Sequence, residues 1–142
     1  MEQRPLDLVK RFFAEWEQGT YAALRGAYAG FLAEDCVYEN SGVPPCRNKA
    51  EALAFIDLAQ KARDIQAIRV ELLHAATAGN VVFTERWDRH VNSRGEEVYP
   101  VRIVGVMEID GGKITAWRDY FDPGEMMAQL EEGASKSSVA GT

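Results

Sequence analysis

The second half of the chain consists of long runs in which apolar and polar residues alternate, and short turns separate these runs. Alternation with a period of two is typical of β-strands, because successive side chains of a strand point to opposite faces. Strands joined by short turns pair antiparallel, and runs of about ten residues are longer than average strands and favour a curved sheet. The runs span residues 65–76, 81–91, 96–109 and 114–122, and the turn before the last is Asp110-Gly111-Gly112, a strong hairpin signal. The sequence therefore predicts a curved, mainly antiparallel sheet.

The first half of the chain carries three helical patterns instead. Apolar residues recur at spacings of three and four residues in 6–16, 21–32 and 48–62, as expected where one face of each helix packs on a core. Asn48 begins the third pattern and Glu51 follows three residues later, which is the signature of a capping box. The expected fold class is therefore α+β, with N-terminal helices packed on the concave face of the curved sheet and enclosing a pocket.

One domain accounts for these patterns. The 142 residues contain no internal repeat and no linker, and we expect a single domain over residues 1–132 that ends in a short helix starting near residue 122. The remaining segment, 133–142, consists mostly of small and polar residues and is expected to form a disordered tail.

Composition argues against several classes of protein. The net charge of −6 at pH 7 argues against a nucleic-acid-binding surface, which requires a basic stripe. No apolar run approaches the roughly 18 residues of a membrane span, and the N-terminal residues do not form a signal peptide, so a cytoplasmic protein without a membrane partner is expected. Cys36 and Cys46 are too few for a disulfide framework, and His74 and His90 lack the ligand-spaced partners of a metal site.

Three charged residues are predicted to face the same pocket. Alternation places Arg86 and Asp88 side by side on one face of the run 81–91, and it places Asp119 on one face with Trp117 and Phe121. An ionised carboxylate between aromatic rings is unfavourable unless it is paired. A guanidinium group has five donors in a fixed plane and can hold one carboxylate on each side. If these two faces are the same concave face, Arg86 pairs with both carboxylates.

Two neutral polar residues are predicted to join this cluster. Tyr38 and Asn40 share one face of an extended segment over residues 34–40. Between them they offer donors and acceptors for one water molecule. A water held by Tyr38, Asn40 and a carboxylate would be a positioned nucleophile with its general base beside it.

The segments that carry these residues resemble the limonene-1,2-epoxide hydrolase family. They are Val-Tyr-Glu-Asn at 37–40, Val-Pro-Pro at 43–45, Glu-Arg-Trp-Asp at 85–88 and Trp-Arg-Asp-Tyr-Phe-Asp at 117–122. The resemblance extends over roughly residues 6–130. It implies a cone-like fold of the scytalone dehydratase and ketosteroid isomerase group, a homodimer and no cofactor. It also implies a catalytic set that matches Asp88, Arg86 and Asp119, with a water held by Tyr38 and Asn40.

The chemistry of epoxide opening agrees with these residue types. Adding water in one step requires a basic carboxylate for the water and a protonated carboxyl for the leaving oxygen, and two acids that share a site tend to hold one proton between them. The resemblance implies that Asp119 is the base and Asp88 the acid. The expected reaction converts a small or medium-sized lipophilic epoxide, for example a terpene-like one, and water to a vicinal diol.

Two alternatives remain open at this stage. One is an isomerase or cyclase on the same fold, including a cyclase that opens an epoxide with an internal hydroxyl. An isomerase of this group needs a lone carboxylate and a neutral oxyanion donor, and an arginine between two aspartates argues against it. The other is a non-catalytic ligand-binding domain.

For the homodimer, we expect contacts through Phe83 and Trp87, which lie on the strand face opposite the charged cluster.

Overall fold

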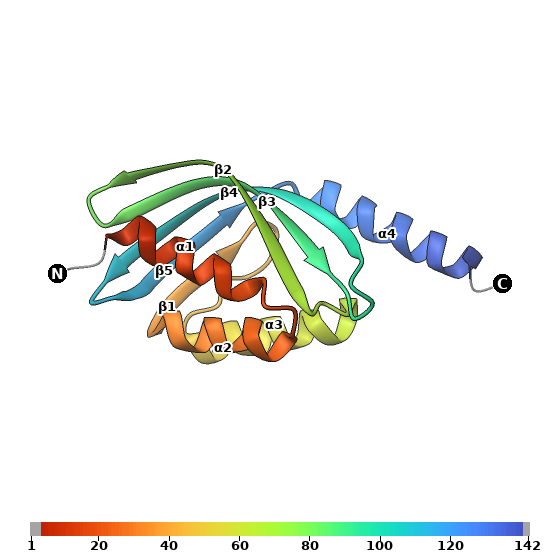
Figure 1. Cartoon of the computed structure of the whole chain (residues 1–142), viewed down its shortest axis with the longest axis horizontal. Helices are drawn as coiled ribbons and strands as arrows, with labels where there is room; N and C mark the ends of the chain where they lie inside the picture. The colour runs from red at the N-terminus through yellow and green to blue at the C-terminus, as the bar shows by residue number, and fades with distance from the viewer. Residues whose placement is uncertain (1–3, 141–142) are drawn as a thin grey trace.

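The polypeptide forms a five-stranded, curved sheet that wraps around three helices in the computed structural model, which describes residues 4–140 (Figure 1). The predicted α+β class with N-terminal helices on the concave face is therefore confirmed. The elements in chain order are α1 (Pro5–Trp16), α2 (Tyr21–Phe31), β1 (Leu32–Asn40), α3 (Lys49–Arg63), β2 (Ala67–Ala78), β3 (Val81–Val91), β4 (Glu97–Asp110), β5 (Lys113–Tyr120) and α4 (Pro123–Ala140).

The order of the strands in the sheet is β1-β5-β4-β3-β2. Strands β2 to β5 form the predicted antiparallel run, in which each strand pairs with the next along the chain. The extended segment that contains Tyr38 and Asn40 becomes strand β1, which pairs parallel to β5 at the edge of the sheet. In that pairing Tyr38 lies opposite Trp117 and Asn40 lies opposite Asp119. The two neutral residues are thus brought next to the predicted base by a long-range parallel contact.

Local sequence explains the ends of the helices. Asn48 begins α3 as predicted: its side-chain oxygen accepts a hydrogen bond from the Glu51 backbone N–H at 2.8 Å, and the Glu51 carboxylate accepts one from the Arg47 N–H at 3.0 Å. Helix α2 ends at Phe31, one residue before the predicted end, because Leu32 already has extended backbone angles and begins β1.

The predicted hairpin between β4 and β5 is also present. Gly111 and Gly112 have φ values of 56° and 75°. Both values lie in the left-handed region that a two-residue turn between twisted antiparallel strands requires and that glycine adopts without strain.

A β-bulge in β2 breaks the strict alternation of the run 65–76. Alternation alone would place His74 on the same face as Leu72, but the register shifts between these residues, so that Leu72 pairs with Arg86 and His74 with Glu85. The inserted residue reverses the facing of every side chain beyond it. His74 therefore lies on the convex face, where its Nδ1 is 2.9 Å from the Glu85 carboxylate.

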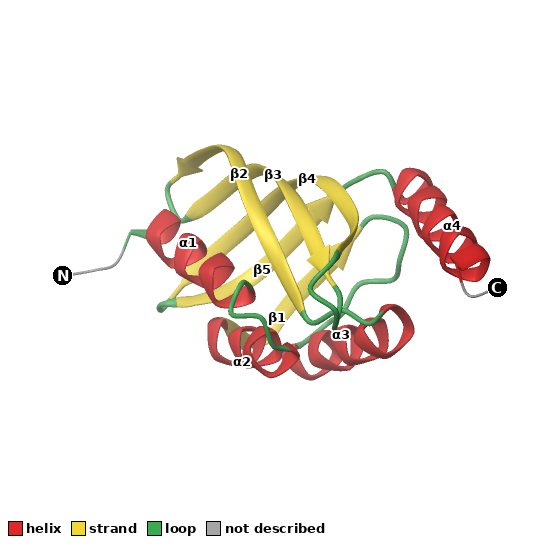
Figure 2. Ribbon diagram, turned by 45° about the vertical axis from the view of Figure 1, so that its right-hand side comes forward, coloured by secondary structure: helices red, strands yellow, loops and turns green. Residues whose placement is uncertain are grey.

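The C-terminal helix is longer than predicted. Helix α4 continues to Ala140 and extends away from the other three helices (Figure 2), whereas the sequence predicted a short helix and a disordered tail over 133–142. The segment after Pro123 contains no further proline to end a helix. Residues 141–142 lie outside the described residues. The division of the chain into a domain over 1–132 and a tail stays a prediction.

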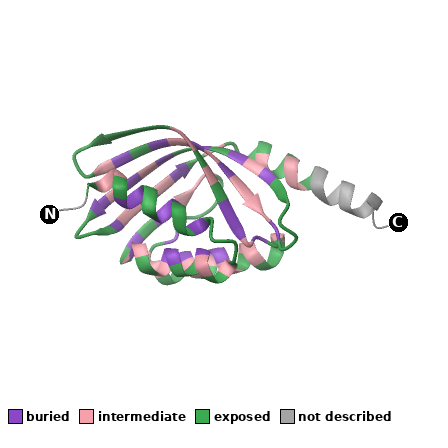
Figure 3. Cartoon of the chain, viewed as in Figure 1, coloured by how far each residue is buried: buried purple, intermediate pink, exposed green. Residues whose placement is uncertain are grey.

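The core lies between the concave face of the sheet and α1, α2 and α3, where the buried positions gather (Figure 3). Its centre is a set of aromatic rings in mutual contact, from Phe12, Trp16, Tyr28, Tyr38 and Trp117. Cys36 and Cys46 are free and buried. Within residues 4–140 there is no helix with the length and apolar character that crossing a membrane demands.

Candidate active site

The predicted charged residues meet on the concave face of three adjacent strands. Arg86 and Asp88 lie two residues apart on β3, and Asp119 lies on β5. The strand between them, β4, contributes Gly105 directly opposite Asp119. All three charged side chains are buried, with exposed fractions of 0% for Arg86 and 4% for each aspartate. The expectation that the two faces are one and the same is confirmed.

Arg86 holds both carboxylates. Its Nε donates to Asp88 Oδ1 at 2.8 Å, and its Nη2 lies 3.3 Å from Asp88 Oδ2 and 2.7 Å from Asp119 Oδ2. Its Nη1 donates to the Thr84 hydroxyl at 3.1 Å, and the Phe13 ring lies 4.9 Å from the guanidinium carbon. Every side of the buried cation is therefore in contact with a carboxylate, a hydroxyl or an aromatic face.

A tryptophan supplies the second partner of Asp119. Trp117 precedes Asp119 by two residues on the same face of β5, and its indole Nε1 donates to Asp119 Oδ1 at 2.8 Å. The aromatic neighbour that makes this position look unsuitable for a carboxylate is thus a hydrogen-bond donor to it. Both oxygens of Asp119 are occupied by donors on the protein.

Burial dominates the electrostatics of the cluster. Desolvation raises the pKa of Asp88 and of Asp119, and the attraction of Arg86 offsets only part of each rise; the charge of Asp88 raises the pKa of Asp119 further. Burial alone would lower the pKa of Arg86, but the two carboxylates outweigh it and raise this pKa above its usual value. One cation between two acids is electrically balanced when the acids share a single proton. The arrangement can therefore offer one basic and one protonated carboxyl group.

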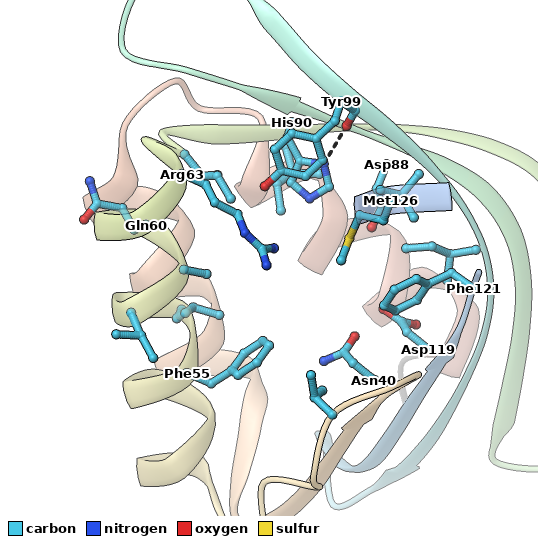
Figure 4. A pocket seen from close by; sticks show the side chains of 18 of the residues that line it. Asn40, Phe55, Gln60, Arg63, Asp88, His90, Tyr99, Asp119, Phe121 and Met126 are labelled. Carbon is cyan, nitrogen blue, oxygen red and sulfur yellow. Dashed lines mark hydrogen bonds between the residues drawn. The ribbon is translucent and has the colours of Figure 1, made fainter. Parts of the chain in front are cut away.

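Tyr38 and Asn40 reach the same site from β1. The Tyr38 ring stacks on Trp117 with centroids 4.2 Å apart, and its hydroxyl lies 3.4 Å from the Tyr28 hydroxyl. Burial raises the pKa of Tyr38, which keeps this hydroxyl protonated and able to donate. Asn40 lines the cavity near Asp119 (Figure 4). The structure thus brings together all five residues that the sequence singled out.

The cluster lies at the wall of a cavity of about 390 Å³ between the sheet and helices α2, α3 and α4. This volume is in the range of pockets that enclose small organic ligands. Apolar side chains form most of the wall, and the polar groups of Asn40, Asp88 and Asp119 enter from the sheet side (Figure 4). The apolar lining includes Leu24, Phe55, Ile56, Ile68, Val101, Ile103, Phe121, Met126 and Met127.

Sequence reasoning missed several polar residues of this cavity: Tyr28, Arg63, His90 and Tyr99 also line it. His90 shares the strand face of Asp88, so alternation along the run 81–91 is a signal that could have placed it in the pocket. Tyr99 lies directly opposite His90 on β4, which only the register reveals. Arg63 sits on a helix, and no strand pattern points to it. Among the side chains of residues 4–131, no group of three or more metal-ligating residues comes together.

Comparison with known proteins assigns this architecture to a family. Residues 4–132 match the limonene-1,2-epoxide hydrolase catalytic domain. The epoxide hydrolase EphG of Mycobacterium tuberculosis is 32% identical over 106 residues, which cover 72% of this chain and 65% of that protein. The aligned region thus spans less than two thirds of the length of that relative.

Comparison with solved structures points to the same family. The structure of an M. tuberculosis LEH-like epoxide hydrolase is similar with a TM-score of 0.68 and 26% identity over 96% of both chains. A protein from Jannaschia sp. CCS1 that is assigned to the SnoaL-like polyketide cyclases has a TM-score of 0.70 but only 15% identity, over 89% of this chain and 90% of its own, and this likeness shows the cone-like fold alone. The chain belongs to the limonene-1,2-epoxide hydrolase family.

The charged cluster depends on the absence of a side chain at Gly105. A Cβ atom there would lie 2.5 Å from Arg86 Nη1, 2.7 Å from Asp119 Oδ1 and 3.1 Å from Thr84 Oγ1. Gly105→Ala is therefore expected to push Arg86 from Asp119 and to lower the free energy of unfolding by about 1–3 kcal/mol in urea denaturation. Gly26→Ala, a position with nothing within 4 Å of an added Cβ, is the control and should be neutral or stabilising. Equal stability of the two variants would contradict this role of Gly105.

Proposed function

We propose that the protein hydrolyses a lipophilic epoxide to a vicinal diol by direct attack of water, without a cofactor. The observation that carries this proposal is the buried set of Asp88, Arg86 and Asp119 at the wall of an apolar cavity. Membership of the limonene-1,2-epoxide hydrolase family supports the same reaction. The volume of about 390 Å³ favours a small or medium-sized substrate.

We assign the general base to Asp119 and the general acid to Asp88. In this scheme Asp119, Tyr38 and Asn40 hold the water, and Asp119 takes its proton as the water oxygen bonds to an epoxide carbon. The carbon–oxygen bond of the ring breaks, and Asp88 gives its proton to the leaving oxygen. Arg86 Nη2 lies between Oδ2 of both carboxyl groups and keeps their charges balanced before and after the transfer. Both proton transfers are thus assigned to side chains of the chain itself.

Direct attack is favoured over an ester intermediate by the surroundings of Asp119. A nucleophilic carboxylate needs a separate base for the second half-reaction, and His90 is the single histidine among the described residues that line the cavity. His90 is an unsuitable base, because its Nδ1 is bound to the Tyr99 carbonyl oxygen at 3.0 Å and burial lowers its pKa to about 4.

The cyclase alternative uses the same acid and base with an internal hydroxyl in place of water, and it remains the second candidate because SnoaL-like proteins share the fold. An isomerase is less consistent with the site, since Arg86 leaves neither carboxylate alone. A ligand-binding domain has no need of three buried charges beside an apolar cavity.

A cytoplasmic location stays a prediction of the sequence.

Replacing the base should remove activity while the fold is kept. Asp119→Asn retains the size of the side chain but not its basicity, so turnover of an epoxide by the variant is expected to fall by about 10²–10⁴-fold. Asp35→Asn, at an exposed position on β1, is the matched control and should behave like the parent. Epoxide turnover measured beside circular dichroism separates loss of chemistry from loss of structure. Near-normal turnover by Asp119→Asn would refute the assignment, and a parent without activity on a broad epoxide panel would refute the hydrolase.

Isotope labelling tests the one-step mechanism. A single turnover in ¹⁸O-labelled water with enzyme in excess is expected to place the label in the diol, because water attacks the epoxide directly. Mass spectrometry of product and protein gives the result. Label in the carboxyl group of Asp119 or Asp88, with an unlabelled first diol, would establish an ester route. A cyclic ether without label would establish the cyclase instead.

We further propose that the protein is a homodimer that pairs through the convex face of the sheet. Phe83, Val104 and Tyr120 are 41%, 48% and 53% exposed on that face. Trp87 lies there as predicted, but it is half-buried between the guanidinium groups of Arg89 and Arg102, at 5.7 and 5.6 Å from its ring centre.

Sedimentation at micromolar concentration is expected to give the mass of a dimer, and Val104→Lys, which puts a charge into the apolar patch, is expected to shift the protein towards monomer. A monomeric parent would contradict the dimer. A parent dimer that Val104→Lys leaves intact would place the interface elsewhere.

A further inference from the structure

A second group of polar side chains lines the cavity: Arg63 on α3, and His90 and Tyr99 on the neighbouring strands β3 and β4. Arg63 is in the last turn of α3, and its guanidinium group points into the cavity, towards the side where His90 and Tyr99 lie (Figure 4). Among the described residues that line the cavity, Arg63 is the single cation. Its guanidinium forms no salt bridge with the side chains of residues 4–131, although every other half-buried arginine of that part is paired with a carboxylate. A cation on a largely apolar wall is thus left without a counter-charge.

Tyr99 adds a buried hydroxyl to this group. Its side chain is 2% exposed, and no described residue makes a well-formed hydrogen bond to its Oη, although the Arg63 guanidinium is close enough to act on it. Burial raises the pKa of Tyr99 to about 12, and the neighbouring charge of Arg63 limits this rise, so the hydroxyl is a donor at neutral pH. A buried hydroxyl without a well-formed hydrogen bond is unfavourable unless something binds it.

The ring of Tyr99 is held in place by His90. The two rings stack with centroids 4.2 Å apart and an interplanar angle of 19°. His90 Nδ1 donates to the Tyr99 carbonyl oxygen at 3.0 Å. His90 is neutral, since burial lowers its pKa, and it therefore adds no second charge beside Arg63. The hydroxyl is a fixed donor next to a single cation.

We propose that Arg63 and Tyr99 bind a carboxylate at one end of the substrate, so that the enzyme acts on lipophilic epoxides that carry an acid group. The proposal rests on the epoxide hydrolase function proposed above and names its substrate class. A guanidinium fork and a hydroxyl donor match the acceptor oxygens of a carboxylate. The apolar side chains that form most of the cavity wall suit a hydrocarbon chain. Arg63 stands on α3, across the cavity from the sheet, so it holds the anion from the helix side (Figure 4).

Helix geometry offers a simpler role for Arg63, and Lys61 is the matched control for it. Both residues are basic groups in the last turn of α3, where a positive charge interacts favourably with the helix dipole. Lys61 is exposed and does not line the cavity. A role in the helix alone would make Arg63→Gln and Lys61→Gln equivalent.

Binding of decanoate, measured by calorimetry against binding of methyl decanoate, tests the site without any chemistry. The parent is expected to bind decanoate about ten- to a hundredfold more tightly than the ester, the range of a charge-assisted hydrogen-bond pair. Arg63→Gln should abolish this preference and Lys61→Gln should retain it. Tyr99→Phe should weaken decanoate binding several-fold without lowering the stability of the ligand-free protein, because no described residue makes a well-formed hydrogen bond to its hydroxyl.

Hydrolysis of two substrates then connects the site to the reaction. One is decanoate with an epoxide at the end remote from the carboxylate, and the other is the methyl ester of the same epoxide. The parent should show the same preference in kcat/KM, and Arg63→Gln should reduce the ratio of acid to ester to about one. Equal binding of acid and ester by the parent, or equal effects of Arg63→Gln and Lys61→Gln, would overturn the carboxylate site. Tight decanoate binding without hydrolysis of either epoxide would support the site and refute the hydrolase.

Discussion

The site depends on one interaction, the guanidinium group of Arg86 between two buried carboxylates. A buried cation or anion is tolerated only when it is fully partnered, and the surrounding residues meet this condition. Thr84 and Phe13 complete the contacts of Arg86, and Trp117 provides the second donor to Asp119. The same burial raises the pKa of the acids, so the arrangement that is costly for folding is also the one that can supply an acid and a base.

The sheet makes this arrangement rigid. The two acids and Arg86 project from strands β3 and β5, and the strand between them leaves room for the cluster at Gly105. Tyr38 and Asn40 stand on a third strand that is hydrogen-bonded to β5. Groups on paired strands are held more closely in position than groups on loops. Curvature of the sheet then directs all of them into the cavity that α2, α3 and α4 close.

The cavity carries two groups of polar side chains within a largely apolar wall. One is the acid–base cluster on the sheet, and the other is Arg63 on α3 with Tyr99 on β4. The fold itself is shared with a SnoaL-like protein at 15% identity, so it does not select the reaction. We infer that the acid–base cluster selects the chemistry and that Arg63 and Tyr99 select the substrate.

Patterns with short range in the sequence were sufficient to predict the elements, the curved sheet, the capping of α3 and the common face of Arg86 and Asp88, because strand parity and turn chemistry are local properties. They were not sufficient where a feature depends on contacts between distant segments. That Asp119 shares this face depends on the pairing of β3 with β4 and of β4 with β5. The bulge that turns His74 to the convex face and the parallel pairing of β1 with β5 are set by register, which many segments determine together. The approach of Arg63 to Tyr99 requires the docking of a helix on the sheet. No local pattern encodes that docking, so only the tertiary structure could reveal the polar group of Arg63 and Tyr99.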